Sequence, residues 1–168
     1  KGKPETEIAT MGCRTKTLAQ LDGTGRVTNR GNIAFTTINL PRLGILANHN
    51  IDKFFELFDN MILDARDELL ERVKFLCTKK AFNFPFLAGQ KTYLGSEDLN
   101  PDDSIEPILR HGTLAIGFLG LAECLQILIG CDHTESKGME LAKKIEGLFK
   151  KRCAARLLTG DMSLQMKH

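Results

Sequence analysis

The chain has 168 residues, of which 42% are apolar and 26% charged, the composition of an ordinary soluble domain that is long enough to bury a core. Its 23 Lys and Arg residues against 21 Asp and Glu leave a net charge of +2 with the two signs interspersed, which argues against a nucleic-acid partner. There is no secretion signal and no apolar run of about 18 residues, so we expect a cytoplasmic protein without a membrane partner.

The cysteines fit neither a disulfide framework nor a zinc site. Their number is odd, and no two of them form a C-x-x-C pair. The five are Cys13, Cys77, Cys124, Cys131 and Cys153. We therefore expect reduced thiols.

The N-terminal part of the chain predicts irregular structure followed by one strand. Residues 1–10 show no helical periodicity, and residues 21–31 contain three glycines, which indicates a turn between two short extended segments. Cys13 is then expected near the tip of a loop. The uncharged stretch NIAFTTINLP, residues 32–41, predicts a strand that is buried on both faces and ended by Pro41, with Asn32 at its first position.

A long helix and a long connection follow. Residues 51–80 contain no glycine or proline, and their apolar residues recur at intervals of three and four, which predicts one amphipathic helix capped by Asn50. At 1.5 Å per residue this helix is about 45 Å long, which indicates a larger parent structure. Residues 82–104 mix proline, glycine and acidic residues, so we expect a connection with little regular structure.

The C-terminal half predicts a second strand and two helices. The stretch GTLAIGFLG, residues 112–120, is apolar and uncharged, as in a fully buried strand whose glycines allow close backbone approach. A short buried helix follows and stops at Gly130. The last helix is expected over residues 136–158. Its inward face is predicted to consist of Met139, Ala142, Ile145, Phe149 and Cys153.

The order strand, helix, strand, helix is typical of an α/β fold in which crossover helices join parallel strands. Only two convincing strands are present besides the segment that carries Cys13, and neither a barrel nor an open sheet closes on that number. We therefore interpret residues 1–168 as a single partial domain.

Local patterns favour structural roles for most of the polar residues. Cys13 is either a buried inert thiol or a functional one, since the preceding Gly12 lets a substrate approach the backbone. Core packing is expected for the other four cysteines. His111 is interpreted as a hydrogen-bonded structural histidine, with ligand binding as the alternative.

Three further patterns are also interpreted as structural. Acidic residues of the connection are expected to form a solvated surface rather than a metal site: Glu97, Asp98, Asp102, Asp103 and Glu106. The phenylalanines of residues 54–58 follow one helix face, which favours the core over base stacking. GTLAIGFLG lacks both the glycine spacing and the lysine of a phosphate-binding loop.

Two stretches go beyond these generic patterns: MGCRT followed by NRGNIAFTTINLPRLGI, and later ILRHGTLAIGFLGLAECL. In order and spacing they resemble anaerobic (class III) ribonucleoside-triphosphate reductase, a glycyl-radical enzyme that converts ribonucleotides to deoxyribonucleotides for DNA replication. The resemblance covers residues 10–130. It implies an α/β fold that is a partial slice of a ten-stranded barrel, with a cysteine-bearing finger loop and a long flanking helix.

The resemblance also implies an active site. Cys13 matches the finger-loop cysteine that becomes a transient thiyl radical and removes the 3′ hydrogen of the substrate ribose. Asn32 matches an asparagine that hydrogen-bonds the ribose hydroxyls or the formate reductant. Met11 matches a methionine beside the radical cysteine, with simple packing as its alternative. Hydrogen-atom transfer suits a neutral thiol in a dry pocket, so it requires no catalytic base.

Other parts of the family pattern have no match here. The sequence contains no R-x-C-G-Y glycyl-radical motif, no C-x-x-C zinc pairs and no counterpart of a second active-site cysteine, and residues 152–168 diverge from the pattern. The resemblance therefore places the glycyl radical, the formate reductant and the zinc site elsewhere in full-length members, with no cofactor bound in this segment. It implies a ribonucleoside triphosphate substrate and a radical-SAM activating enzyme as partners. A fragment of this kind is expected to be inactive alone and to form homo-oligomers if its cut surfaces are apolar.

Two alternatives stay open. One is a non-catalytic folding or assembly module whose cysteine is merely buried. The other is a different glycyl-radical enzyme resembling pyruvate formate-lyase, against which NRGNI and INLPR argue.

Overall fold

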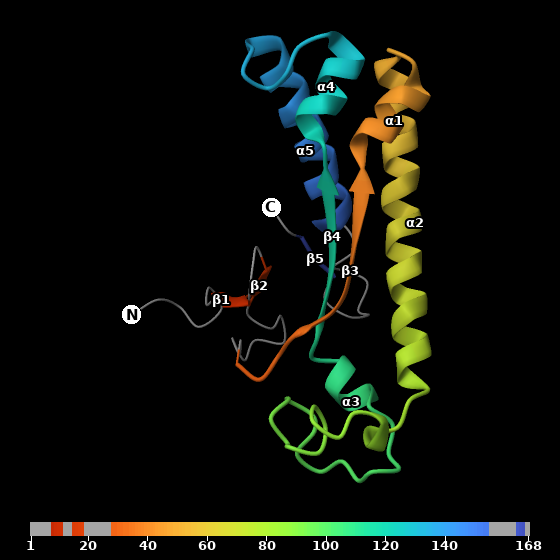
Figure 1. Cartoon of the computed structure of the whole chain (residues 1–168), viewed down its shortest axis with the longest axis vertical. Coiled ribbons are helices and arrows are strands. Elements are labelled where there is room, and N and C mark those ends of the chain that lie inside the picture. The colour runs from red at the N-terminus through yellow and green to blue at the C-terminus, as the bar shows by residue number, and fades with distance from the viewer. Residues whose placement is uncertain (1–7, 12–14, 19–27, 155–163, 167–168) are drawn as a thin grey trace. The chain divides into compact units, whose positions relative to one another are not determined.

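The computed structural model describes residues 8–11, 15–18, 28–154 and 164–166 (Figure 1). The chain divides into two compact units. Residues 1–35, 68–115 and 160–168 form one unit, and residues 36–67 and 116–159 form the other. Among the described residues, no helix has both the length and the apolar character that crossing a bilayer requires.

A short hairpin comes first. Strand β1 (Ile8–Met11) pairs antiparallel with β2 (Thr15–Leu18), and Met11 stands opposite Thr15. The prediction of irregular structure through residue 10 is therefore wrong from residue 8 onward. Four-residue strands are too short for alternation to reveal them, although their threonine and isoleucine content suits a strand.

The two predicted strands are present and lie next to each other. They are β3 (Asn32–Asn39) and β4 (Thr113–Leu119), and the short β5 (Leu164–Met166) follows β4 in the sheet order. The arrows of β3 and β4 point the same way (Figure 1). The mixed α/β class with a parallel strand pair is thus confirmed, whereas the ten-stranded barrel remains an implication of the resemblance.

Strand β3 is buried less than predicted. Phe35, Thr37 and Asn39, which share one face, are exposed, and the side chain of Phe35 is 65% accessible. Burial on both faces is therefore wrong for β3. In β4 the prediction of a fully buried strand holds for the first four residues, all of which are buried, but not for the last three, of which Leu119 is 52% exposed.

Strand β3 runs directly into a helix that the sequence pattern did not reveal. Helix α1 (Leu40–Ala47) begins at the residue after Asn39, whose side chain accepts a hydrogen bond from the Arg42 backbone at 3.1 Å. Pro41 lies in the first turn, where its missing N–H costs no hydrogen bond. It thus begins a helix instead of simply ending a strand.

The predicted long helix is α2 (Ile51–Cys77), three residues shorter than expected. Its cap is confirmed, because Asn50 Oδ1 accepts a hydrogen bond from the Lys53 backbone at 3.0 Å. Beyond Cys77 the chain instead forms a bridge between Lys80 and Ser104.

The connection that follows α2 is irregular, as predicted, apart from a 3-10 turn η2 (Ala81–Asn83) and the one-turn helix α3 (Glu106–Leu109). It encloses a small apolar cluster in the first unit. The buried members of that cluster are Ala81, Ala88, Ile105 and Leu109.

The second unit is held by helix packing. Helix α4 (Leu121–Ile129) packs on α1, and Gly44 allows the close approach because a Cβ there would lie 3.4 Å from Cys124 Sγ. Gly130 ends α4 in the left-handed conformation, at φ 75°. Phe58 of α2 stacks on Phe149 at 6.2 Å between ring centroids.

The last helix is α5 (Ser136–Ala154), and the residues immediately after it lie outside the described part of the chain. Four of the five residues predicted to face inward are buried: Ala142, Ile145, Phe149 and Cys153. Met139 is 40% exposed, so its assignment to the core is wrong. Leu141 is buried instead, since the packed face is rotated relative to the one predicted.

Candidate functional site

Asn32 and Thr113 form a polar pair at the start of the two parallel strands. Each is the first residue of its strand, and the backbone N–H of Thr113 donates to the carbonyl of Gly31 at 2.9 Å. This register places the two side chains together, and the Thr113 hydroxyl donates a hydrogen bond to Asn32 Oδ1. Thr113 is only 1% exposed, so its hydroxyl requires a partner inside the protein.

The segments that precede the two strands are also joined. Arg30 is 6% exposed, and its Nε donates to the backbone carbonyl of His111 at 2.7 Å. Gly112 lies so close to β3 that a Cβ there would come within 2.3 Å of Ile33 Cγ1. The close approach predicted for the glycines of this strand is confirmed at Gly112, and it brings the polar pair into contact.

An apolar pocket of about 230 Å³ borders Asn32. Most of its lining comes from the end of α2, the connection and α3: Leu76, Phe84, Leu87, Tyr93, Ile105, Ile108 and Leu109. Asn32 and Tyr93 are the lining residues with polar side chains. A hydrogen bond from Asn32 is stronger beside such a surface than in water, because the local dielectric is low.

The structure describes the other two predicted site residues only in part. Met11 is the last residue of β1, while Cys13 lies outside the described residues. The hairpin register leaves three residues, 12–14, to connect β1 with β2. Cys13 is the middle one of these in the sequence, so the expectation that it lies near a loop tip stays a prediction.

Three of the other cysteines pack in the core, as predicted. Cys124, Cys131 and Cys153 are buried. Burial raises the pKa of the Cys124 thiol to about 12 and that of Cys153 to about 11. Cys124 and Cys153 are therefore neutral and unreactive at physiological pH.

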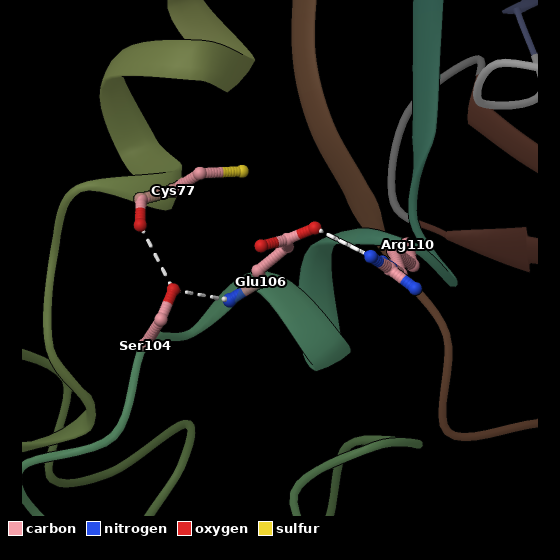
Figure 2. Close-up of polar contacts among 4 residues, drawn as sticks. All are labelled: Cys77, Ser104, Glu106 and Arg110. Atoms are coloured by element: carbon pink, nitrogen blue, oxygen red, sulfur yellow. Dashed lines mark hydrogen bonds and ion pairs between the residues drawn. The ribbon is translucent and has the colours of Figure 1, made fainter.

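Cys77 is half-buried and belongs to a polar link between α2 and α3 (Figure 2). Ser104 Oγ donates to the Cys77 carbonyl at 2.8 Å and accepts from the Glu106 backbone at 3.1 Å. Arg110 in turn donates to Glu106 Oε1. Burial and then the Glu106 charge raise the pKa of Cys77, and Arg110 only partly opposes them. A structural role fits this protonated thiol.

The acidic residues of the connection form a solvated surface, as predicted. Glu97, Asp98, Asp102 and Asp103 are exposed, and Glu106 is half-buried. Among the described residues, no three His, Cys, Asp or Glu side chains gather in a way that could hold a metal ion.

Sequence reasoning found Asn32 and missed the two residues that hold it in place. Thr113 is the second residue of the GTLAIGFLG run, and Arg30 stands in the NRGN motif, so each lies in a stretch that carries the family resemblance. What the sequence could not show was the pairing, because 81 residues separate Asn32 from Thr113. The available signal was a threonine near the start of an otherwise apolar stretch, because a hydroxyl in a buried strand requires a hydrogen-bond partner.

Comparison with known proteins adds a family. The profile of the family described as anaerobic ribonucleoside-triphosphate reductase matches residues 1–158. An anaerobic ribonucleoside-triphosphate reductase of Enterobacteria phage T4 is 30% identical over 151 residues, which cover 85% of this chain and 24% of the phage protein. The proteins of the same name from Escherichia coli and Salmonella typhimurium are 29% and 28% identical, over 69% of this chain and 16% of their own length. The chain thus spans about a quarter or less of these relatives.

Proposed function

Because the chain belongs to the anaerobic ribonucleoside-triphosphate reductase family, we propose that it forms part of the catalytic subunit of such a reductase. The proposed oxidoreductase converts ribonucleoside triphosphates to deoxyribonucleoside triphosphates. The family profile, which matches nearly the whole chain, and the names of the relatives support this proposal. They argue against the alternative of a different glycyl-radical enzyme resembling pyruvate formate-lyase. The match to a catalytic family also favours an enzyme segment over a non-catalytic folding or assembly module.

In this proposal Cys13 acts as the thiyl radical that removes a hydrogen atom from the substrate ribose, and Asn32 hydrogen-bonds the substrate or the reductant. Met11 assists beside Cys13. The observation that carries the site is the Asn32–Thr113 pair beside an apolar pocket. A carboxamide donates and accepts hydrogen bonds without introducing charge, which suits chemistry on a neutral radical.

The remaining chemistry is assigned to other segments of the enzyme. A glycyl radical, a formate reductant, a zinc site and a radical-SAM activating enzyme are proposed on the family resemblance alone. The described residues do not fit a zinc site, since Cys124 and Cys153 are separately buried thiols with raised pKa values.

Replacement of Cys13 in the complete reductase subunit tests the proposal. We expect Cys13→Ala and Cys13→Ser to lower deoxyribonucleotide formation by more than about a thousandfold, because neither side chain can form a thiyl radical. The measurement is the initial rate of product formation by the activated enzyme. Cys131→Ala, at a buried cysteine of the second unit, is the matched control and should keep its activity. Undiminished turnover by a folded Cys13→Ala enzyme would remove the radical role.

A further inference from the structure

The Thr113 hydroxyl and the Asn32 carboxamide depend on each other. Thr113 is almost fully buried, and the partner of its hydroxyl is Asn32 Oδ1. A buried hydroxyl proton without an acceptor is costly, and Asn32 Oδ1 is the acceptor that the structure gives it, so the carboxamide oxygen is turned toward Thr113.

This orientation decides which end of the amide is available to a ligand. Asn32 is half-buried and borders the apolar pocket. Its oxygen is occupied by Thr113, and among the described residues no acceptor takes a hydrogen bond from Nδ2. The group of Asn32 without a partner among the described residues is therefore its N–H donor.

We propose that Thr113 is a positioning residue that fixes the Asn32 carboxamide so that it presents its N–H group to a ligand oxygen. The inference rests on the proposed function, in which Asn32 contacts substrate or reductant. The ligand atom is then an acceptor, either the oxygen of a ribose hydroxyl or that of a carboxylate. Asn32 acts as a donor in this role, and Thr113 acts through Asn32 without touching the ligand.

The backbone around the pair is arranged to hold this geometry. The Thr113 N–H donates to the Gly31 carbonyl, and Arg30 donates to the His111 carbonyl, so both strand starts are tied by hydrogen bonds. Gly112 removes the side chain that would otherwise push Ile33 away. A side chain held by such neighbours reaches its ligand with little loss of rotational freedom.

Three substitutions separate positioning from simple structure. Thr113→Val keeps the shape and removes the donor, Thr113→Ser keeps the donor, and Asn32→Asp keeps an acceptor for Thr113 while removing the N–H group. Thr37→Val, on the exposed face of β3, is the matched control. In the 168-residue chain, the Asn32 side-chain amide resonances report the orientation. We expect them to move toward those of an unrestrained asparagine in Thr113→Val only.

In the complete subunit we expect Thr113→Val to lower kcat/KM about tenfold, because a hydrogen bond of this kind contributes about that factor. Thr113→Ser should restore it to within about twofold, and Asn32→Asp should lose about a hundredfold or more. Equal melting temperatures of the Thr113 variants exclude a folding cause. A positioning role predicts that Thr113→Ser restores kcat/KM and that the melting temperatures of the variants do not change in parallel with their activities.

The outcomes distinguish the two proposals. If Thr113→Val leaves both the amide resonances and kcat/KM unchanged while Asn32→Asp is inactive, the positioning role is overturned and the proposed function stands. If Asn32→Asp keeps full activity, the N–H group is not required and the positioning role is overturned, because a carboxylate accepts a hydrogen bond from a ribose hydroxyl but donates none. An Asn32→Asp chain whose Thr113 hydroxyl proton is no longer protected from exchange also overturns the orientation.

Discussion

The orientation of the Asn32 side chain depends on a residue that is far away in the sequence. Its place at a strand start followed from the NIAFTTINLP pattern, and its candidacy followed from the family resemblance. Its orientation depends on Thr113, because the hydroxyl of that residue, which is 1% exposed, donates its proton to Asn32 Oδ1. No local pattern carries this information, since hydrogen bonds between parallel strands join residues far apart in the chain.

The buried Cys124 thiol predicts a pH dependence of stability. Its pKa is raised from 9.0 to about 12, so the folded state favours the protonated form. The contribution of the protonated Cys124 thiol to the free energy of unfolding is fully present below pH 9. It declines as the pH rises from 9 toward 12, because only the unfolded chain loses the proton in this range. At a pH one unit above the unfolded pKa the loss is about 1.4 kcal/mol.

Urea unfolding at pH 8 and pH 10, chosen to lie on either side of the ordinary thiol pKa of 9.0, measures this loss. Cys124→Ala and Cys124→Ser lack an ionisable group, so each should show a smaller fall in unfolding free energy than the natural chain. If the alanine and serine variants show the same fall between the two pH values, the difference from the natural chain is due to ionisation of the thiol and not to altered packing. A fall of the same size in all three chains would contradict the assignment.

At the scale of elements, the strongest periodic segments were predictable and the short ones were not. The 27 residues of α2 and the cap at Asn50 follow from an uninterrupted apolar pattern. Helix α1 has only eight residues and contains both Pro41 and Gly44, so its propensity is low and its stability comes from packing against α4. That packing is invisible until the fold is known.

Two glycines of α5 predict opposite effects of the same substitution. A Cβ at Gly138 would lie 1.8 Å from the Asp132 carbonyl oxygen, whereas a Cβ at Gly147 meets nothing within 4 Å. Gly138→Ala should therefore lower the free energy of unfolding by about 1–3 kcal/mol. Gly147→Ala should raise it by roughly 0.5–1 kcal/mol, because alanine restricts the unfolded chain. Thermal unfolding followed by circular dichroism compares the two variants. Equal shifts of their melting temperatures would contradict the difference in space around Gly138 and Gly147.

At the scale of the whole chain, the sequence predicted the α/β fold class correctly, but it did not predict which strand faces are exposed. Alternating strands and helices indicated the α/β arrangement, and the structure contains the parallel pair. The exposed face of β3 was not foreseen, because an uncharged strand looks the same whether a neighbour covers it or not. Barrel closure likewise depends on strands that no local pattern in this chain specifies.

The exposed apolar side chains predict that the isolated chain self-associates. Large apolar residues with at least half of their surface accessible are Phe35, Ile45, Leu46, Phe75, Phe82, Phe86 and Leu119. A net charge of +2 provides little electrostatic repulsion to oppose contact. Sedimentation velocity should show species heavier than 18.7 kDa that diminish in Phe86→Ser and Ile45→Lys. A monomer at all concentrations would contradict this expectation.

The junctions between strand and helix constrain how this sequence can change over evolutionary time. Helix α1 starts at the residue after β3, and only Gly120 separates β4 from α4. One inserted or deleted residue in either strand would exchange its two faces and turn the following helix by about 100°, with no slack to absorb the error. We therefore expect related sequences to differ in residues 32–47 and 113–129 by replacement and not by length, and to place insertions and deletions in the connection of residues 82–104 instead.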